Sequence, residues 1–294
     1  MVRKKAKSEV SLDDSVHGKA LFEKIQSSGD RTLKGAYDDY LKYREKIGSL
    51  KILKNKAVND LVEATNEYRK KVLYVFEKRQ HSGQEGLRSS ILEEFLFHLF
   101  RDLMNQRLSN NLKSKRIGKA NIYINLSFTP HSFKDLYKEP HPYVHTKDQD
   151  FTLGCLANLS VGPFGDENHI TTDSIIIPVV AIECKTYLER NMLDSCASTA
   201  HRIKLGMPYC MYIVISEYMK MDDAYPELTE IDEVFVLCKA RNSERQEFEK
   251  KNRPPHLIDS KLVQDLFSMV KRHLNRIWWS PDEALRRGRI ICRP

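Results

Sequence analysis

The hydrophobic and polar positions in the first third of the chain follow a helical period. Between Val16 and Gln80, apolar residues recur every three or four positions with charged residues between them, most clearly over residues 61–79. Residues 28–30 (Ser-Gly-Asp) and 48–49 (Gly-Ser) interrupt the pattern and indicate breaks between helices. The following stretch, GLRSSILEEFLFHLFRDLM, is apolar on more than one face, so it predicts a buried helix.

Further along the chain, short apolar runs replace the helical period and predict β-strands. The five runs are residues 122–128, 150–161, 174–185, 209–216 and 233–238. Residues 188–204 have a helical pattern between the third and fourth runs, and residues 262–279 predict a late helix. This order predicts an α/β fold, in which helices flank a central sheet and a further helical region precedes it.

Composition limits the class of protein. The chain is 41% hydrophobic and 30% charged, and none of its apolar runs approaches the ~20 residues that a membrane-spanning helix needs. The basic N-terminus lacks the apolar segment of a secretory signal. Six cysteines occur without a CxxC pair. We therefore expect reduced thiols in a cytoplasmic protein, and no zinc site built from these cysteines.

The positive charge is concentrated near the N-terminus. The net charge is +8, and residues 1–80 contain 19 lysines and arginines against 12 aspartates and glutamates. Smaller basic clusters occupy residues 113–119 and 286–289. A solvated helical surface explains such charge as well as a polyanionic partner does, so charge alone leaves both interpretations open. The change from helical to strand patterns, together with this charge, predicts a boundary near residue 80.

The third strand run ends on a carboxylate and an ammonium group. Glu183 and Lys185 alternate with Cys184, so they project from the same face of the strand, about 7 Å apart along it. An acid-x-Lys triplet is weak evidence alone, since residues 249–251 and 259–261 also contain one, in polar sequence. Only the triplet at 183–185 closes an apolar strand. A surface ion pair is one interpretation, and a divalent cation with a phosphate is the other.

A metal site would need a second carboxylate, because hard cations bind several oxygen ligands. The candidates are Asp148, Asp150, Asp166 and Asp173. Asp173 lies ten residues before Glu183 on one strand, which is roughly 33 Å, and Asp166 has the same difficulty in milder form. Asp148 is on the correct side but two residues early. Asp150 is therefore our predicted first acid, with the other three left open.

Strand pairing supports this choice. If residues 150–161 and 174–185 form an antiparallel hairpin that turns within 162–172, Asp150 lies opposite Glu183. The same register pairs the apolar residues on one face, namely Phe151 with Ile182, Leu153 with Val180 and Cys155 with Pro178. The predicted hairpin thus keeps the acids together and the core intact.

A histidine site is less favoured. His141 and His145 in EPHPYVHTKDQD have the four-residue spacing of a metal-binding pair on a helix. Two prolines disfavour a helix there, so we do not expect the two rings to share a face.

The order helix, three strands, helix, strand, with an aspartate followed by an acid-x-Lys triplet, resembles the PD-(D/E)xK nuclease superfamily. The matching residues here are Asp150, Glu183 and Lys185. The longer string ECKTYLERNMLDSCASTAHRIKLGMPY resembles type II restriction endonucleases of the BbvCI and DdeI group, with the likeness strongest over residues 85–240. Gln149 stands where the motif has proline. The resemblance implies a restriction-endonuclease-like core with a mixed central sheet.

The resemblance also implies roles for individual residues. Asp150 and Glu183 would bind Mg²⁺, and Lys185 would position the attacking water or stabilise charge on the scissile phosphate. A further catalytic glutamate is implied on the helix before the sheet, at Glu93 or Glu94. We prefer Glu94, because its helical spacing from Leu87 and Ile91 places it on an inward stripe.

The expected function is that of a sequence-specific type II restriction endonuclease subunit in the bacterial cytoplasm. It would cut one strand of duplex DNA per active site, and a second nuclease subunit would complete a homodimer or a heterodimer. The resemblance favours a short asymmetric site with a CTNAG-like core. Residues 1–80 would be a basic helical DNA-binding or accessory region, and residues 81–294 the nuclease domain with C-terminal helices. A repair nickase of the same superfamily and a non-catalytic DNA-binding partner subunit are the alternatives.

Overall fold

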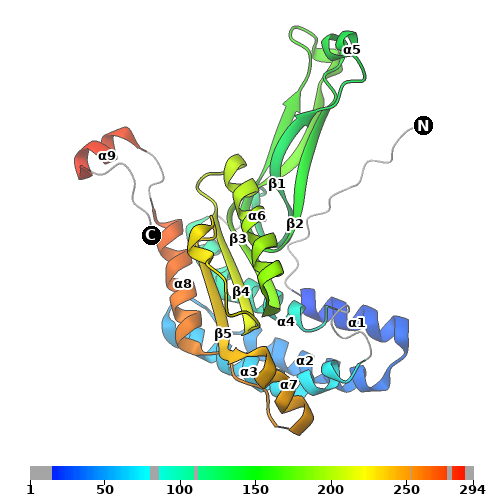
Figure 1. The fold of residues 1–294 in the computed structure, drawn as a ribbon, viewed down its shortest axis with the longest axis vertical. Coiled ribbons are helices and arrows are strands. Elements are labelled where there is room, and N and C mark those ends of the chain that lie inside the picture. Colours follow the sequence, from blue (N-terminus) through cyan, green and yellow to red (C-terminus); the bar gives the residue numbers. More distant parts are fainter. Residues whose placement is uncertain (1–14, 80–85, 109–111, 252, 277–279, 289–294) are drawn as a thin grey trace.

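The computed structural model describes residues 15–79, 86–108, 112–251, 253–276 and 280–288 (Figure 1). The helices are α1 (Val16–Ser28), α2 (Arg31–Gly48), α3 (Asn55–Glu77), α4 (Ser89–Arg107), α5 (Phe133–Lys138), α6 (Arg190–Gly206), α7 (Asn242–Lys251), α8 (Ser260–Leu274) and α9 (Pro281–Arg287). The strands are β1 (Lys115–Phe128), β2 (Pro142–Val161), β3 (Thr171–Leu188), β4 (Met211–Met219) and β5 (Glu233–Arg241). Within these ranges, no helix is both long and apolar enough to cross a lipid bilayer.

The five strands form one mixed sheet in the order β1-β2-β3-β4-β5. The pairs β1–β2 and β2–β3 are antiparallel, whereas β3–β4 and β4–β5 are parallel. A parallel neighbour requires a crossover, and α6 provides it between β3 and β4. The predicted α/β fold with a mixed central sheet is confirmed.

Each face of the sheet has its own hydrophobic core. On one face, residues of β2, β3, β4 and β5 pack against α3, α4 and α8, with α1 and α2 beyond them. On the other face, Ala181, Tyr212 and Val214 pack against α6 through Leu193 and Ala200. The alternation of side chains along a strand produces this division, because consecutive residues of β3 enter opposite cores.

The N-terminal helices share a core with the rest of the chain. Leu21 of α1, Leu33 of α2 and Leu61 of α3 belong to the same buried cluster as Phe95 of α4 and Phe267 of α8. The helices on either side of residue 80 are therefore packed together in the described residues. The division of function between residues 1–80 and 81–294 stays a prediction.

A buried network of charged side chains ties these helices to the sheet. The carboxylate of Glu217 on β4 accepts hydrogen bonds at 2.8 Å from Arg69 of α3 and at 2.8 Å from Arg88, which precedes α4. Arg69 and Glu217 are fully buried. Burial by itself would raise the pKa of Glu217, but the two guanidinium groups lower it to about 2. We call Arg69, Arg88 and Glu217 the buried arginine–glutamate network.

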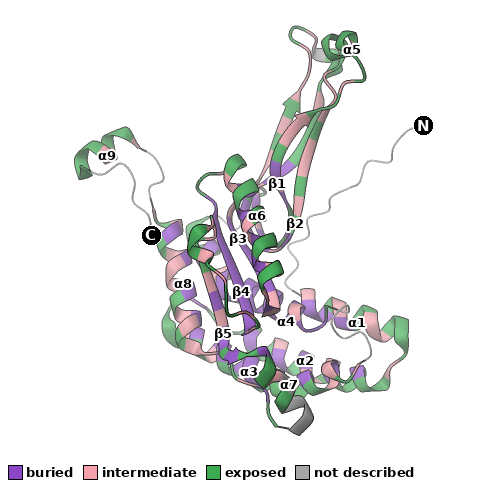
Figure 2. Cartoon of the chain, in the orientation of Figure 1, coloured by how far each residue is buried: buried purple, intermediate pink, exposed green. Residues whose placement is uncertain are grey.

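Strands β1 and β2 extend beyond this body as an arm, with α5 at its far end (Figure 1). Most residues of the arm are exposed or half-buried, whereas β4 is almost wholly buried (Figure 2). This exposure explains why β2 begins at residue 142 instead of 150. A strand that faces solvent on both sides has no apolar run, and α5, which buries no residue, has no helical stripe. β1 begins at residue 115 instead of 122 in a part that is largely buried, where Lys115, Arg116 and Lys119 interrupt the apolar pattern.

The predicted hairpin register is correct near the acids and shifts further along. Phe151 pairs with Ile182 and Leu153 with Val180, as expected. Cys155 pairs with Ile177 instead of Pro178, because a β-bulge between Leu153 and Gly154 leaves one extra residue in β3. Of the other predicted features, residues 277–279 at the end of the late helix, Arg289 of the last basic cluster and Cys292 lie outside the described residues.

Candidate functional site

The site lies where the pairing of β2 with both of its neighbours is interrupted. The β1–β2 register passes from Gly118–Thr152 to Ala120–Gln149, so Asp150 and Phe151 lie opposite the single residue Lys119. The β2–β3 register ends at Phe151–Ile182. Bulges of this kind change the direction of side chains at the edges of active sites. Here the interruption frees the Asp150 side chain from the regular ladder.

Asp150 and the end of β3 are joined by a hydrogen bond. The backbone N–H of Cys184 donates to Oδ2 of Asp150 at 2.8 Å. Burial and the charge of Glu183 raise the pKa of Asp150, against the opposing effects of the Cys184 N–H, Lys185 and Lys119. The Asp150 carboxylate therefore lies in a place where its negative charge lacks sufficient compensation.

Glu183 holds the centre of the cluster. Its Oε1 accepts a hydrogen bond from Nζ of Lys185 at 2.6 Å, and its Oε2 accepts one from Nε2 of Gln149 at 3.0 Å. Burial disfavours the ammonium form of Lys185, but Glu183 more than offsets this and raises the lysine pKa. The predicted same-face relation of Glu183 and Lys185 is confirmed. Gln149, which the sequence shows only as a departure from the motif, orients Glu183.

A third carboxylate, that of Glu93 on α4, faces the same cluster. Burial raises the pKa of Glu93 to about 7; Lys119 opposes this, and the charges of Asp150, Asp148 and Glu183 add to it. Nζ of Lys119 lies 3.9 Å from Oε2 of Glu93. Lys119 is the residue opposite the β2 bulge, next to Gly118, whose φ of 107° lies in the left-handed region. Sequence reasoning treated Lys119 only as part of a basic cluster.

The preference for Glu94 over Glu93 is wrong as to position. Glu94 is fully buried on the other side of α4, where it accepts hydrogen bonds from the backbone N–H groups of His17 at 2.9 Å and Gly18 at 3.3 Å. It also accepts one from the Tyr40 hydroxyl at 3.0 Å and pairs with Arg44 at 3.2 Å. Glu94 thus satisfies the first N–H groups of α1. Both helix faces are buried, so periodicity could not distinguish the two glutamates.

The remaining aspartates do not contact Asp150 or Glu183. Asp148 is exposed and lies 3.8 Å from Nζ of Lys119. Asp173 pairs with Leu159 at the far end of β3, and Asp166 forms a hydrogen bond with His169 in the turn between β2 and β3. The structure therefore brings together Asp150, Glu183 and Lys185 of the predicted site, with Glu93 in place of Glu94.

A cavity of about 440 Å³ opens beside the cluster. Its lining includes Asp150, Lys185, Tyr187, Arg88 and Arg245. Asp150 and Lys185 of the cluster therefore border the cavity, and Arg88 and Arg245 in its wall both pair with Glu77, which also lines it. Such a site is suited to bind a cation and an anion together, as hydrolysis of a phosphodiester requires.

A mixed sheet flanked by helices, with two acids and a lysine at the interrupted ends of β2 and β3, defines a restriction-endonuclease-like fold of the PD-(D/E)xK class. The model of the Bpu10I restriction endonuclease family matches residues 84–289. The chain belongs to this family of restriction endonucleases, and it is a type II restriction endonuclease subunit as the sequence predicts.

A solved structure shares the fold across almost the whole chain. It is described as "native BbvCI A2B2 tetramer at low resolution" and superposes with a TM-score of 0.67 at 20% identity. The likeness covers 88% of this chain and 96% of that one, so it extends into residues 1–83, which the family match leaves out. No curated protein matches the chain.

Proposed function

We propose that this chain hydrolyses phosphodiester bonds of duplex DNA with Mg²⁺, cutting one strand per active site at a specific sequence. The observation that carries the proposal is the cluster of Asp150, Glu183 and Lys185, held together by hydrogen bonds of 2.8 and 2.6 Å that involve β3. Family membership supports a nuclease, and the cluster supports a catalytic subunit over a non-catalytic partner.

The residues present fit a hard divalent cation. Each carboxylate oxygen has two lone pairs, so Asp150 and Glu183 retain acceptor capacity beyond their hydrogen bonds. The raised pKa of Asp150 and of Glu93 indicates an excess of negative charge that a cation would relieve. In addition, Oε1 of Gln149 is buried without a hydrogen-bond partner. Asp150 and Glu183 would hold Mg²⁺, which lowers the pKa of bound water and stabilises charge on the phosphate.

The chain's own groups supply the remaining chemistry. Lys185 is half-buried and charged, and it faces the cavity beside Asp150, where it would stabilise negative charge on the phosphate. Glu93 has a pKa of about 7, so it exchanges a proton near neutral pH and is suited to act as a general base or an additional metal ligand. Glu94 takes no part, since its carboxylate is engaged with α1 and α2.

DNA contacts would come from the basic surfaces. The exposed lysines of α2 and α3 include Lys34, Lys42, Lys56 and Lys70. These residues support the proposal that residues 1–80 contact phosphates in a sequence-independent and salt-dependent manner. Sequence recognition would need base contacts in the major groove. The A2B2 assembly of the BbvCI structure supports a second, different subunit as the partner, and two different subunits would suit a short asymmetric site.

A plasmid digest with Mg²⁺ tests the proposal. We expect the wild type to cut or nick at fixed positions, and Asp150→Ala and Lys185→Glu to lose cleavage by a factor on the order of 10³ or more, because each removes a group that stabilises charge in the transition state. Lys261→Glu is the matched control, since it changes the exposed lysine of another acid-x-Lys triplet. It should cut like the wild type.

The products separate the possible arrangements. Discrete fragments from the wild type alone would indicate a homodimer, whereas nicked circles would indicate half of a heterodimer. The digest is repeated with any second subunit encoded nearby, which should convert nicks into double-strand breaks. Cuts at random positions would contradict sequence specificity and indicate a repair-type nickase. Undiminished cleavage by Lys185→Glu would disprove the assignment of the active site.

A further inference from the structure

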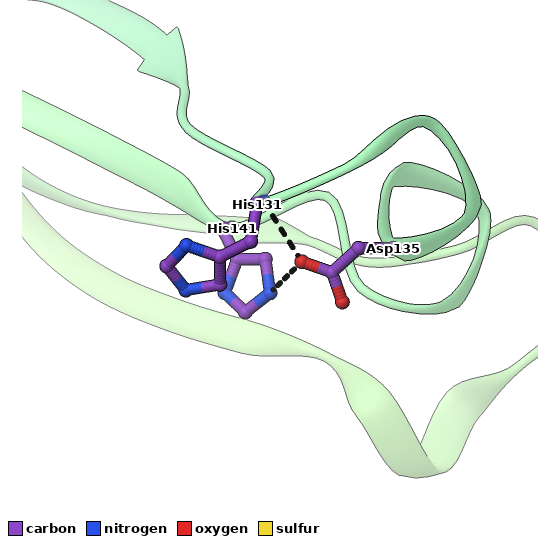
Figure 3. Close-up of side chains that lie close together, drawn as sticks. All are labelled: His131, Asp135 and His141. Atoms are coloured by element: carbon purple, nitrogen blue, oxygen red, sulfur yellow. Dashed lines mark hydrogen bonds and ion pairs between the residues drawn. The ribbon is translucent and has the colours of Figure 1, made fainter.

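A second cluster of metal-binding side chains lies at the far end of the arm, away from the candidate active site. It consists of His131, which follows β1, Asp135 in the first turn of α5, and His141 immediately before β2 (Figure 3). One ligand atom of each residue lies within 4.8 Å of the others. Among the described parts of the chain, no other group of three such residues meets this condition.

The Asp135 carboxylate is already fixed between the two histidines. Its Oδ2 accepts a hydrogen bond from the backbone N–H of His131 at 2.9 Å and lies 3.1 Å from Nε2 of His141. The imidazole rings are adjacent, with centroids 5.3 Å apart (Figure 3). Sequence spacing could not reveal this arrangement, because His141 meets His131 across the α5 turn, whereas His145 on β2 bonds to Ser127 instead.

The tip lacks the apolar packing that usually orders such a structure. Helix α5 has six residues and buries none of them, and Phe133 and Tyr137 are 75% and 70% exposed. A helix of this length is not stable alone, since nucleation is unfavourable and few backbone bonds follow. A hydrogen bond from the Asp135 N–H to the Ser132 hydroxyl caps it. The rings of Phe133 and Tyr137 contact each other edge to face, and the polar side chains of the tip supply further contacts.

The backbone at His141 is also unusual. Its φ is 48°, in the left-handed region that favours glycine, so the surrounding structure must hold it there. This conformation directs the ring of His141 toward Asp135. Strained backbone at a position that presents a ligand is a common feature of binding sites.

We propose that His131, Asp135 and His141 bind one Zn²⁺ ion, which joins α5 to the end of β1 and the start of β2 at the tip of the arm. Two imidazoles and one carboxylate suit zinc, and water would complete a tetrahedral site. Zinc–nitrogen bonds of about 2.0–2.1 Å place tetrahedral ligands roughly 3.3 Å apart, so small rotations of exposed side chains would close the cluster. The imidazoles distinguish this site from the oxygen-rich cluster of Asp150 and Glu183.

The test measures zinc on the full chain, produced without a histidine tag and with the Asp150→Asn substitution, so that the acidic cluster does not compete. Bound metal is measured by mass spectrometry after dialysis against a weak chelator. Zinc affinity is measured by competition with a chromophoric chelator. We expect one tightly bound zinc per chain. His131→Ala with His141→Ala should weaken binding more than a hundredfold, since outer-sphere changes alone cost about 10–100-fold.

The chain offers a matched control. His169 and Asp166 form a similar exposed pair, with Nδ1 of His169 2.6 Å from Oδ2 of Asp166, and no third ligand joins them among the side chains that the structure describes. His169→Ala should bind zinc like the parent. Zinc should also protect residues 129–141 from limited proteolysis in the parent and not in the double variant. Cleavage by the double variant in the wild-type Asp150 background reports that the fold is intact.

Two outcomes would overturn the zinc proposal. In the first, the parent binds no zinc, and the three residues form only a hydrogen-bonded cluster. In the second, the double variant binds as much zinc as the parent, so that the metal lies elsewhere. Neither outcome bears on the proposed nuclease function, which the plasmid digest tests separately.

Discussion

Two clusters of charged side chains that border the same cavity, one through Arg88 and the other through Asp150 and Lys185, are balanced in opposite ways. In the buried arginine–glutamate network, one carboxylate is paired with two guanidinium groups, and the pKa of Glu217 falls to about 2. In the acidic cluster, the carboxylates of Asp150, Glu183 and Glu93 are accompanied, among the described residues, by the ammonium groups of Lys185 and Lys119. There the pKa of Glu93 rises to about 7.

The difference separates a structural role from a functional one. A buried carboxylate that is fully compensated by cations holds helices and strands together and has no affinity left for a metal ion. A cluster with excess negative charge destabilises the folded protein until a cation binds. The same residue types therefore stabilise the fold at Glu217 and, under the proposed function, would prepare a cation site at Asp150. The following predictions test this comparison, beginning with the largest effect.

Removing the central acid should have opposite effects in the two clusters. Glu217→Gln leaves Arg69 as an uncompensated buried charge and Arg88 with Glu77 as its remaining carboxylate partner, so we expect the free energy of unfolding to fall by about 3–5 kcal/mol. Asp150→Asn relieves repulsion between carboxylates and should leave stability unchanged or higher. Urea unfolding at neutral pH, without divalent cations, measures both. Equal losses in the two variants would contradict the distinction.

Glu93 should lower stability only when it is ionised. Its pKa is about 7 in the folded protein against a usual value of 4.5, so the folded state binds the extra proton between these pH values. The stability linked to that proton is present below pH 4.5 and is lost as the pH rises through 7. Glu93→Gln should therefore match the wild type near pH 4.5 and exceed it at pH 8 by up to about 3 kcal/mol.

Glu94→Gln is the natural control for that experiment. An amide has one acceptor oxygen, so either the N–H groups of α1 or Tyr40 and Arg44 would lose their partner. We expect a loss of about 2 kcal/mol at pH 8. DNA cleavage should persist in Glu94→Gln and fall in Glu93→Gln. If Glu94→Gln abolished cleavage in a stable protein, the preference for Glu93 would have to be reversed.

The smallest effect should come from adding the cation. A ligand at concentration c that binds only the folded state stabilises it by RT ln(1 + c/Kd), which is about 1.4 kcal/mol at a concentration of ten times its Kd. Mg²⁺ should therefore raise the unfolding free energy of the wild type and have little effect on Asp150→Asn. It should not change the loss caused by Glu217→Gln, because that network has no excess negative charge. Denaturant unfolding with and without Mg²⁺ provides the measurement.

The sequence predicts more of the site than of its surroundings. Glu183 and Lys185 follow from a strand that ends in an acid-x-Lys triplet, and Asp150 follows from keeping apolar residues on one face of a hairpin. The register near Phe151 is correct for the same reason. The slip beyond Leu153 could not be foreseen, because Gly154, whose added Cβ would lie 2.6 Å from the Ile177 carbonyl oxygen, forms a close contact that is visible only in three dimensions.

The sequence by itself determined the α/β class, the strand that ends in Glu183 and Lys185, and the resemblance to restriction endonucleases, since periodicity and motif spacing are local properties of the chain. The tertiary structure alone decided which glutamate of α4 faces the acids, which lysine accompanies them, and that His131 meets His141 through a helix that buries nothing. Each of these depends on the direction of a side chain relative to a distant segment. A bulge or a helix buried on both faces sets that direction, and neither produces a pattern of apolar and polar residues that reveals it in the sequence.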